Sequence, residues 1–252
     1  MHPVLFSIGF LRVYSYGFML AVAFLISNYL ASRRSHIFNL PGDYINNLTL
    51  ILLVSGIIGA RVFYVLMNIE YFSKKPLESF MISRGGLVFY GGLLLAFLSG
   101  IIFSKINKLS ILDTADLIAP FAALGHAIGR IGCFLNGCCY GKETISPLGI
   151  KYPGIDAKIY PTQLFSSAGL FIIFLILFYL QPKRKFKGQV LFLYLILYGI
   201  SRFFIEFLRG DLMPVYYNLT LTQLISIACV IAGLLLYFIG ERHERSLRNQ
   251  QK

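Results

Sequence analysis

The amino-acid sequence predicts an all-α, polytopic integral membrane protein with about seven transmembrane helices. Of its 252 residues, 57% are hydrophobic and only 13% are charged, and the mean hydropathy is +0.71. Soluble domains carry about a quarter charged residues, so a soluble globular protein is excluded. The apolar residues also form runs of roughly 20, the length that crosses a hydrocarbon core about 30 Å thick. The same composition excludes disordered, collagen-like, coiled-coil and small disulfide-rich chains.

Seven apolar runs are candidate spans, and together they predict one transmembrane domain over residues 1–252. Helices are expected because lipid offers no partner to backbone polar groups and no segment alternates as in a barrel. The chain start lacks a basic region and the first run has full spanning length, so a cleaved signal peptide is not expected. Two small arms are expected outside the membrane, at about 67–86 and 141–160. The predicted spans are 13–30, 48–66, 87–104, 117–135, 162–180, 190–207 and 219–239.

The distribution of basic residues predicts the orientation. The chain has 23 Lys and Arg against 11 Asp and Glu, a net charge of +12. Twelve of the basic residues fall on one side of the predicted spans and eight on the other. The richer side is expected to be cytoplasmic, with the N-terminus outside and the C-terminus inside. We attribute the excess to this rule and to anionic lipid headgroups, so a nucleic-acid partner is not expected.

Three arginines, Arg61, Arg130 and Arg202, fall within apolar runs. A basic side chain near the bilayer centre costs roughly 2.5–3.5 kcal/mol on insertion scales, so each one needs a partner. Glu206 follows Arg202 by four residues and shares its helix face, which Arg209 extends. The pair is interpreted either as a self-satisfied helical ion pair or as part of a polar cavity inside the bundle.

Arg130 lies in a glycine-rich stretch, 129–141, that also contains Asn136. The glycines predict an interrupted helix at membrane depth, which is tolerated only where it lines a cavity. A guanidinium with an amide nearby suits an anion such as phosphate, because the planar fork binds two oxygens at once. Arg61, which also follows glycines, is a second candidate contact for a phosphate or carboxylate. The alternative is that these glycines serve helix packing alone.

Other polar residues give weaker signals. Tyr16 fits an interfacial anchor, and Tyr90 fits the core. His126 precedes Arg130 by four residues and is either a buried neutral side chain or a proton acceptor beside an anion site. Gln163 follows a proline at an expected helix start. Three of the four cysteines, at 133, 138 and 139, have no second Cys/His cluster nearby, so zinc is a weak signal and no metal is predicted.

Six segments, taken in order, resemble the prolipoprotein diacylglyceryl transferase family, whose members begin bacterial lipoprotein maturation. The most specific is the signature Gly-Arg-x-Gly-x-Phe-x-Asn-Gly at 129–137. The resemblance runs along most of the chain. The segments are 14–17, 59–61, 85–92, 129–141, 160–164 and 198–209.

The resemblance implies seven spans, an outside N-terminus and a cytoplasmic C-terminus in the bacterial cytoplasmic (inner) membrane. It implies transfer of the diacylglyceryl group of phosphatidylglycerol to the lipobox cysteine thiol of a preprolipoprotein, with release of glycerol phosphate and formation of a thioether. No cofactor is implied, and the remaining partners are membrane lipids. The positions that match functional positions of the family are Tyr16, Arg130, Asn136, Gly141, Arg202 and Glu206, together with Arg61, Gln163 and Arg209 at less specific positions.

Three positions depart from the family pattern. Many members have a histidine, considered as a base, where this chain has Tyr90, and the signature usually has asparagine at Cys133 and glutamate at Cys138. The resemblance therefore implies either a divergent subgroup with rearranged polar partners, in which His126 compensates, or a relative that acts on another acceptor.

Two other classes of function stay open at this stage. An anionic-lipid transporter or scramblase would use the same arginine cavity without chemistry, and it would move headgroups without adding mass to a lipobox peptide. A purely structural membrane subunit would leave the three intramembrane arginines without a role.

Overall fold

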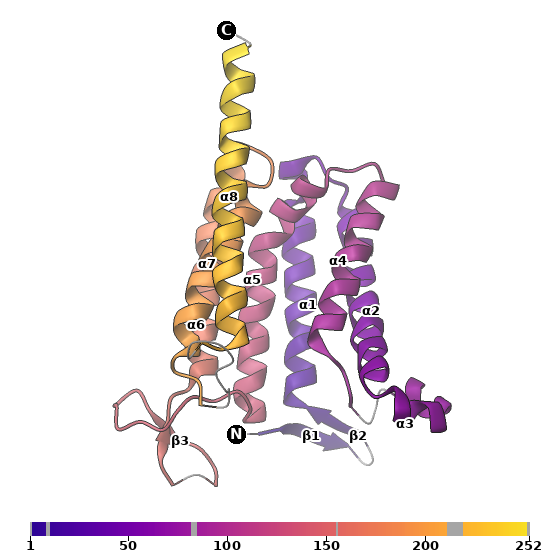
Figure 1. The fold of residues 1–252 in the computed structure, drawn as a ribbon, viewed down its shortest axis with the longest axis vertical. Helices are drawn as coiled ribbons and strands as arrows, with labels where there is room; N and C mark the ends of the chain where they lie inside the picture. Colours follow the sequence, from indigo (N-terminus) through magenta and orange to yellow (C-terminus); the bar gives the residue numbers. More distant parts are fainter. Residues whose placement is uncertain (1, 9–10, 82–84, 155, 211–218, 251–252) are drawn as a thin grey trace. The chain divides into compact units, whose positions relative to one another are not determined.

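The computed structural model describes residues 2–8, 11–81, 85–154, 156–210 and 219–250 of the chain (Figure 1). These residues form two compact units, unit 1 with Met1–Ala31 and Ala115–Lys252, and unit 2 with Ser32–Thr114. The prediction that the whole chain makes one transmembrane domain stays a prediction.

Seven described helices are long and apolar enough to cross a membrane, which confirms the predicted number and class. The predicted orientation stays a prediction, and Arg84 and Lys252, which it counted, lie outside the described residues. The helices are α1 (Ser15–Arg34), α2 (Gly42–Met67), α4 (Phe89–Ile106), α5 (Ile111–Asn136), α6 (Thr162–Leu180), α7 (Gln189–Glu206) and α8 (Leu221–Gln250).

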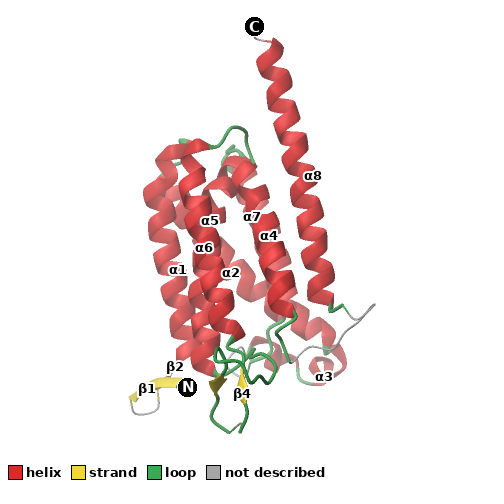
Figure 2. Ribbon diagram, turned by 90° about the vertical axis from the view of Figure 1, so that its left-hand side faces the viewer, coloured by secondary structure: helices red, strands yellow, loops and turns green. Residues whose placement is uncertain are grey.

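The last helix is longer than its predicted span, which ended at 239. The tail of α8 carries Glu241–Arg245 and Glu244–Arg248 ion pairs at 2.7 and 3.4 Å. Such i,i+4 pairs stabilise an exposed helix, so α8 continues beyond its apolar part. Its C-terminal part extends past the other helices of unit 1 (Figure 2).

Short elements lie at the opposite end of unit 1, which we call its hairpin end (Figure 1). Strands β1 (Val4–Ile8) and β2 (Leu11–Tyr14) pair antiparallel, as do β3 (Ile150–Lys151) and β4 (Lys158–Ile159). The predicted first span therefore starts two residues too early, because Val13 and Tyr14 belong to β2 and α1 starts at Ser15. Helices α5 and α7 end at the hairpin end, and α1, α6 and α8 begin there.

Helix α5 packs against α1 through glycines. A Cβ at Gly125 would lie 3.0 Å from Ser27 Oγ, and one at Gly132 would lie 3.0 Å from Met19 Cβ. The helix runs without a break from Ile111 to Asn136, so the predicted interruption within it is wrong. The glycines there let α5 and α1 approach closely, and α5 ends at Asn136.

At the end of unit 1 opposite the hairpin end, Asp116 of α5 connects this helix to the start of α7. Asp116 is fully buried. Its Oδ2 accepts hydrogen bonds from Arg184 Nη1 and the Gly188 amide, both at 2.8 Å, and its Oδ1 accepts one from the Leu191 amide at 2.9 Å. Gln181 Nε2 donates to the Asp116 carbonyl at 3.0 Å. One carboxylate thus neutralises an arginine and satisfies amides at the start of α7.

Unit 2 is held by the close contact of α2 with α4. A Cβ at Gly59 would lie 2.5 Å from the Gly91 carbonyl oxygen, and one at Gly92 would lie 2.7 Å from that of Gly56. This is the packing role expected of small residues between membrane helices. The predicted arm at 67–86 contains a short helix, α3 (Ile69–Lys74), and a 3₁₀ helix, η2 (Pro76–Phe80).

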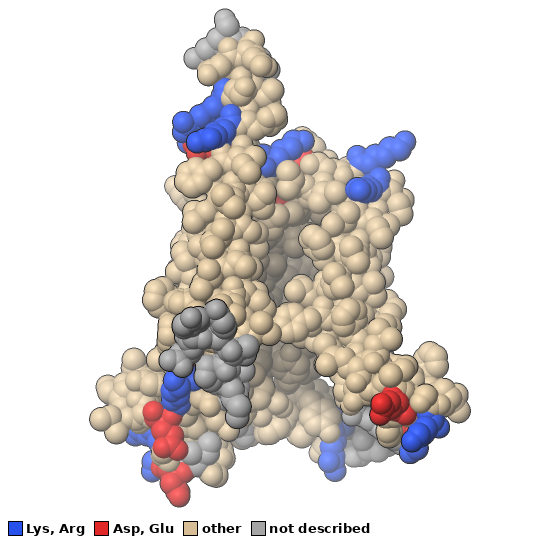
Figure 3. Space-filling view, in the orientation of Figure 1, with Lys and Arg blue, Asp and Glu red and all other residues tan. Residues whose placement is uncertain are grey.

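Charged side chains on the face shown in Figure 3 gather at the helix ends of each unit, while the middle of the helices is uncharged. Large apolar side chains are exposed along these middle parts, for example Leu25 at 70%, Phe97 at 63% and Leu235 at 58%. Such a surface fits contact with lipid acyl chains. The chain is therefore a multi-pass membrane protein.

Candidate functional site

Two of the three intramembrane arginines line the same cavity in unit 1. Arg130 projects from α5 and Arg202 from α7, and the cavity between them measures about 10 Å³, space for about one water molecule. We call it the arginine cavity. Its lining is completed by His126, Ser166, Leu170, Tyr198, Ser201 and Ile205.

Arg202 is paired with Glu206, one turn further along α7, as its spacing predicted. Arg202 Nη2 lies 2.9 Å from Glu206 Oε2, and the two side chains are 11% and 0% exposed. Glu206 Oε1 accepts a hydrogen bond from Thr220 Oγ1 at 2.9 Å. Among the described residues, Oε2 accepts no well-aligned hydrogen bond, so it holds Arg202 by charge alone. The predicted ion pair is confirmed, and its Arg202 also lines the arginine cavity.

Arg130 is held by His126, one turn earlier on α5. Its Nε donates to His126 Nε2 at 3.2 Å. The acceptor nitrogen needs a free lone pair, so the imidazole is neutral with its proton on Nδ1. The Tyr198 ring lies 5.6 Å from the His126 ring. His126 thus orients a guanidinium, and its predicted role as a proton acceptor is untested.

Tyr16 and Asn136 lie near the hairpin end. Tyr16, the second residue of α1, is 41% exposed and packs against Gly132 of α5. Its hydroxyl lies near Arg130 and Cys133. Asn136 is the exposed last residue of α5 and its side chain contacts Cys138. Both predicted residues therefore border the segment that follows α5.

Gly141 lies where three segments of unit 1 meet. Its amide donates to the Tyr160 carbonyl at 2.9 Å, and it forms an isolated antiparallel bridge with Arg209. A Cβ here would lie 2.6 Å from the Leu208 carbonyl oxygen, so any side chain would displace backbone. Gly141 therefore sets the position of Arg209, three residues after the end of α7.

Gln163 fixes the loop that contains Cys138 and Cys139. It is 1% exposed; its Nε2 donates to the Cys138 carbonyl at 2.6 Å, and its Oε1 accepts from Tyr152 at 3.0 Å. Thr162 Oγ1 adds a bond to the Cys139 carbonyl at 2.9 Å. The amide predicted to bind lipid is thus engaged with protein, which gives Gln163 a positioning role.

Arg61 belongs to unit 2, and all five of its N–H groups are used. Nε donates to Ser79 O at 2.7 Å, Nη1 to Gly85 O and Gly86 O at 2.8 and 3.1 Å, and Nη2 to Glu78 O and Met81 O at 2.7 and 3.1 Å. This saturation argues against the predicted phosphate contact, since no donor is left for a ligand. Arg61 instead holds the arm at 67–86 onto α2.

Tyr90 is also a residue of unit 2. It lies in the first turn of α4, is 52% exposed, and its ring packs edge-on against Phe89 at 5.7 Å. It is therefore exposed, whereas the pattern had favoured a core position. Its predicted catalytic role is untested.

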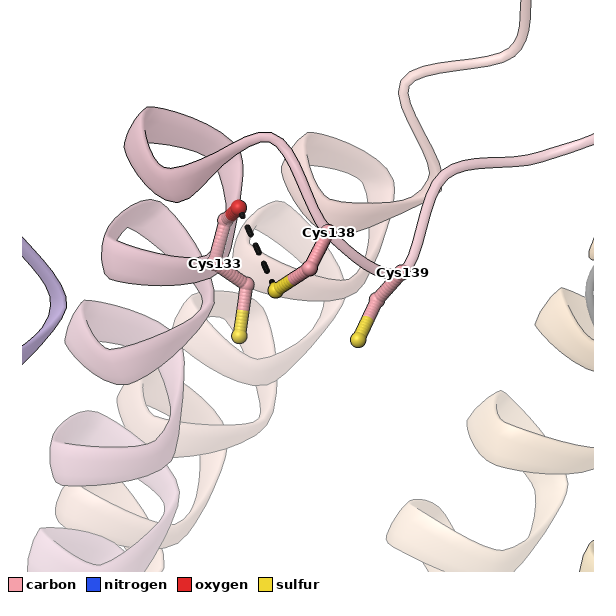
Figure 4. Close-up of side chains that lie close together, drawn as sticks. All are labelled: Cys133, Cys138 and Cys139. Atoms are coloured by element: carbon pink, nitrogen blue, oxygen red, sulfur yellow. Dashed lines mark hydrogen bonds between the residues drawn. The ribbon is translucent and has the colours of Figure 1, made fainter. Parts of the chain in front are cut away.

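Three thiols gather where α5 gives way to the loop (Figure 4). The sulfur atoms of Cys133, Cys138 and Cys139 all lie within 4.8 Å of one another. Hydrogen bonding from Cys133, with the nearby positive charges of Arg209 and Arg130, lowers the pKa of Cys139. The three cysteines stood out in the sequence, but the turn that brings them together was not predicted.

A larger, apolar groove lies between α5 and α6, with a volume of about 410 Å³. Its walls share α5 and α6 with the arginine cavity: Ile131 follows Arg130, and Ser167 follows Ser166. This groove was not predicted from the sequence, although its residues recur at helical spacing on each helix. They are Leu124, Ala127, Ile128 and Ile131 on α5, and Leu164, Ser167, Ala168 and Phe171 on α6.

Comparisons with known proteins agree with the motifs. The family model described as prolipoprotein diacylglyceryl transferase matches residues 3–239. The phosphatidylglycerol–prolipoprotein diacylglyceryl transferase 2 of Clostridium perfringens is 37% identical over 246 residues, covering 96% of each chain. A phosphatidylglycerol–prolipoprotein diacylglyceryl transferase of Finegoldia magna is 38% identical over 94% of each chain. One of Clostridioides difficile is 32% identical over 99% of this chain and 100% of its own.

Proposed function

Because the chain belongs to the prolipoprotein diacylglyceryl transferase family, we propose that it transfers the diacylglyceryl group of phosphatidylglycerol to a lipobox cysteine thiol, with the arginine cavity holding the phosphate. The lipobox cysteine is that of a preprolipoprotein, and the reaction takes place at the outer leaflet of the bacterial cytoplasmic membrane. The predicted orientation supports this placement, since the hairpin end of unit 1 then faces outward.

The net charge of the cavity is the observation that carries this proposal. Two guanidinium groups and one carboxylate leave a charge of +1 at membrane depth, where an unbalanced charge is costly. The single negative charge of a phosphodiester would cancel it. Among the described residues, only His126 and Glu206 pair with the two arginines, so their other N–H groups remain for phosphate oxygens.

The cavity must widen to admit a phosphate, because in this structure it holds about one water. The ion pair permits this movement, since Glu206 Oε2 holds Arg202 without a well-aligned hydrogen bond. Glu206 itself stays fixed by Thr220. Arg202 can therefore turn toward a ligand while its counter-charge remains in place.

The apolar groove offers a separate surface for hydrocarbon. Its lining is hydrocarbon except for Ser167, whose hydroxyl already donates to the Ala127 carbonyl at 2.9 Å. The groove and the arginine cavity share α5 and α6, but consecutive residues of a helix point about 100° apart, so the two hollows face different sides of these helices. The groove can therefore hold an acyl chain, while the arginines alone define the phosphate site.

The chemistry is a displacement at carbon. The acceptor sulfur forms a bond to the diacylglyceryl carbon that carries the phosphate, the carbon–oxygen bond breaks, and its electron pair leaves on the oxygen of glycerol phosphate. The thiol proton leaves to solvent or a base. A free thiol is only a few per cent ionised at neutral pH, so positive charge nearby favours the attacking thiolate. Arg130 and Arg202 also stabilise the charge that develops on the leaving phosphate.

Reconstituted vesicles test the proposal. The purified protein is placed in phosphatidylglycerol vesicles with a lipobox peptide, and we expect the peptide to gain the mass of a diacylglyceryl group through its cysteine. A matched peptide with serine in place of that cysteine should gain nothing. Movement of labelled phosphatidylglycerol between leaflets without peptide modification would instead identify a lipid scramblase and reject the transferase.

A further inference from the structure

The three-cysteine cluster has a geometry that the proposed reaction does not use. In a tetrahedral zinc site the metal–sulfur distance is about 2.3 Å, so bound sulfurs lie about 3.8 Å apart. The sulfur atoms of Cys133, Cys138 and Cys139 already lie within 4.8 Å of one another. Closing onto one ion therefore requires each pair to approach by about 1 Å or less.

The backbone around these thiols is fixed by residues far apart in the chain. Cys133 lies in the last turn of α5, and the Cys138 amide donates to its carbonyl at 3.2 Å. Gln163 and Thr162 hold the carbonyls of Cys138 and Cys139 at 2.6 and 2.9 Å. Cys139 adopts a left-handed φ of +63°, uncommon for a residue with a side chain. This conformation leaves its sulfur on the same side as the other two (Figure 4).

Positively charged side chains lie close to the cluster. Arg209 and Arg130 are both near Cys139. Three thiolates around a divalent ion carry a net charge of −1, which nearby positive charge stabilises. No Asp or Glu belongs to the cluster among the described residues. A set of sulfur donors alone selects soft metals over magnesium or calcium.

We propose that Cys133, Cys138 and Cys139 bind a single thiophilic d¹⁰ metal ion, Zn(II) or Cu(I), through three thiolates. All three residues are only partly buried, so the ion is reachable from outside the protein core. Three protein ligands leave the fourth tetrahedral position of Zn(II) to water or a small ligand, whereas Cu(I) is satisfied by three sulfurs. The site goes beyond the transferase activity and does not depend on it.

Cobalt titration of the full-length protein in detergent tests the site, because Co(II) replaces Zn(II) and is coloured in a tetrahedral thiolate site. Metal-free, reduced protein should take up one Co(II) per chain with a thiolate-to-cobalt charge-transfer band. One equivalent of Zn(II) should bleach the band. Competition with a Cu(I) chelator then decides between the two ions by their relative affinities.

Variants locate the ligands. Cys138→Ser and Cys133→Ser should each weaken Co(II) binding at least tenfold and shift the charge-transfer band. Cys229→Ser is the matched control, because Cys229 lies in α8 outside the cluster, and it should leave the titration unchanged. The proposal is overturned by a missing band in folded wild-type protein, by an unchanged titration in both cluster variants, or by a disulfide that forms within the cluster in preference to metal binding.

Discussion

Arg130 Nε donates a hydrogen bond to His126 Nε2 over 3.2 Å, one turn back along α5. The acceptor fixes the Nε edge of a guanidinium that lines the arginine cavity. This makes His126 a positioning residue for Arg130.

His126→Phe keeps an aromatic ring but removes the acceptor. A hydrogen bond to a charged group contributes about 1.5 kcal/mol or more, so we expect kcat/KM for phosphatidylglycerol to fall about tenfold, mainly through KM. His126→Gln, which retains an acceptor, should recover much of the loss. Equal activities of the two variants in the vesicle assay would contradict a positioning role.

The Arg202–Glu206 pair predicts opposite effects on stability and activity. Glu206→Gln leaves a buried guanidinium without its counter-charge, and we expect unfolding to become easier by about 3 kcal/mol. Adding Arg202→Met should restore much of this stability, because both charges are then gone. The double variant should nevertheless lack transferase activity. Thermal unfolding in detergent and the vesicle assay measure the two effects separately.

The sequence predicted the membrane helices well because each apolar run has a length and composition that only a spanning helix satisfies. It also paired Arg202 with Glu206, since i,i+4 spacing fixes their common face. It did not reveal contacts between distant segments. Arg61 resembles Arg130 in its sequence context, but carbonyls of the arm at 67–86, up to 25 residues later, accept its N–H groups.

The interruption predicted within α5 failed for a related reason. Glycine permits both a broken helix and a close helix contact, and only the neighbouring α1 decides between them. Asp116 gave no signal as a key residue, because its partners Arg184 and Leu191 lie 68 and 75 residues away. The cysteine cluster depends on the left-handed turn at Gly137 and Cys139, which composition does not reveal.

Replacing Asp116 should lower the stability of the protein, although this residue lies outside the arginine cavity. Asp116→Asn leaves Arg184 without its charge partner and weakens the bonds to α7, so we expect a loss of about 3 kcal/mol in unfolding free energy. Glu241→Gln is the control, because it removes an exposed ion pair worth well under about 1 kcal/mol. A similar melting temperature for the two variants would contradict the fastening role of Asp116.

Gly141 predicts a steric effect. Gly141→Ala places a methyl group 2.6 Å from the Leu208 carbonyl oxygen, so the loop must shift and move Arg209. We expect a cost of about 1–3 kcal/mol and a clear loss of transferase activity. Gly17→Ala, with nothing within 4 Å of the new methyl, should be neutral or slightly stabilising. Equal activity in both variants would show that the close approach at Gly141 is dispensable.

An Arg61 variant can show whether this residue holds the arm at 67–86 or binds the lipid headgroup. Arg61→Lys keeps the positive charge but offers three N–H donors in place of five, so several carbonyls of the arm at 67–86 lose their partner. We expect the arm to become cleavable by protease at least tenfold faster, while KM for phosphatidylglycerol changes little in the remaining intact protein. Limited proteolysis and initial rates measure the two quantities. A raised KM with unchanged proteolysis would return Arg61 to the headgroup-binding role that its place in the sequence first indicated.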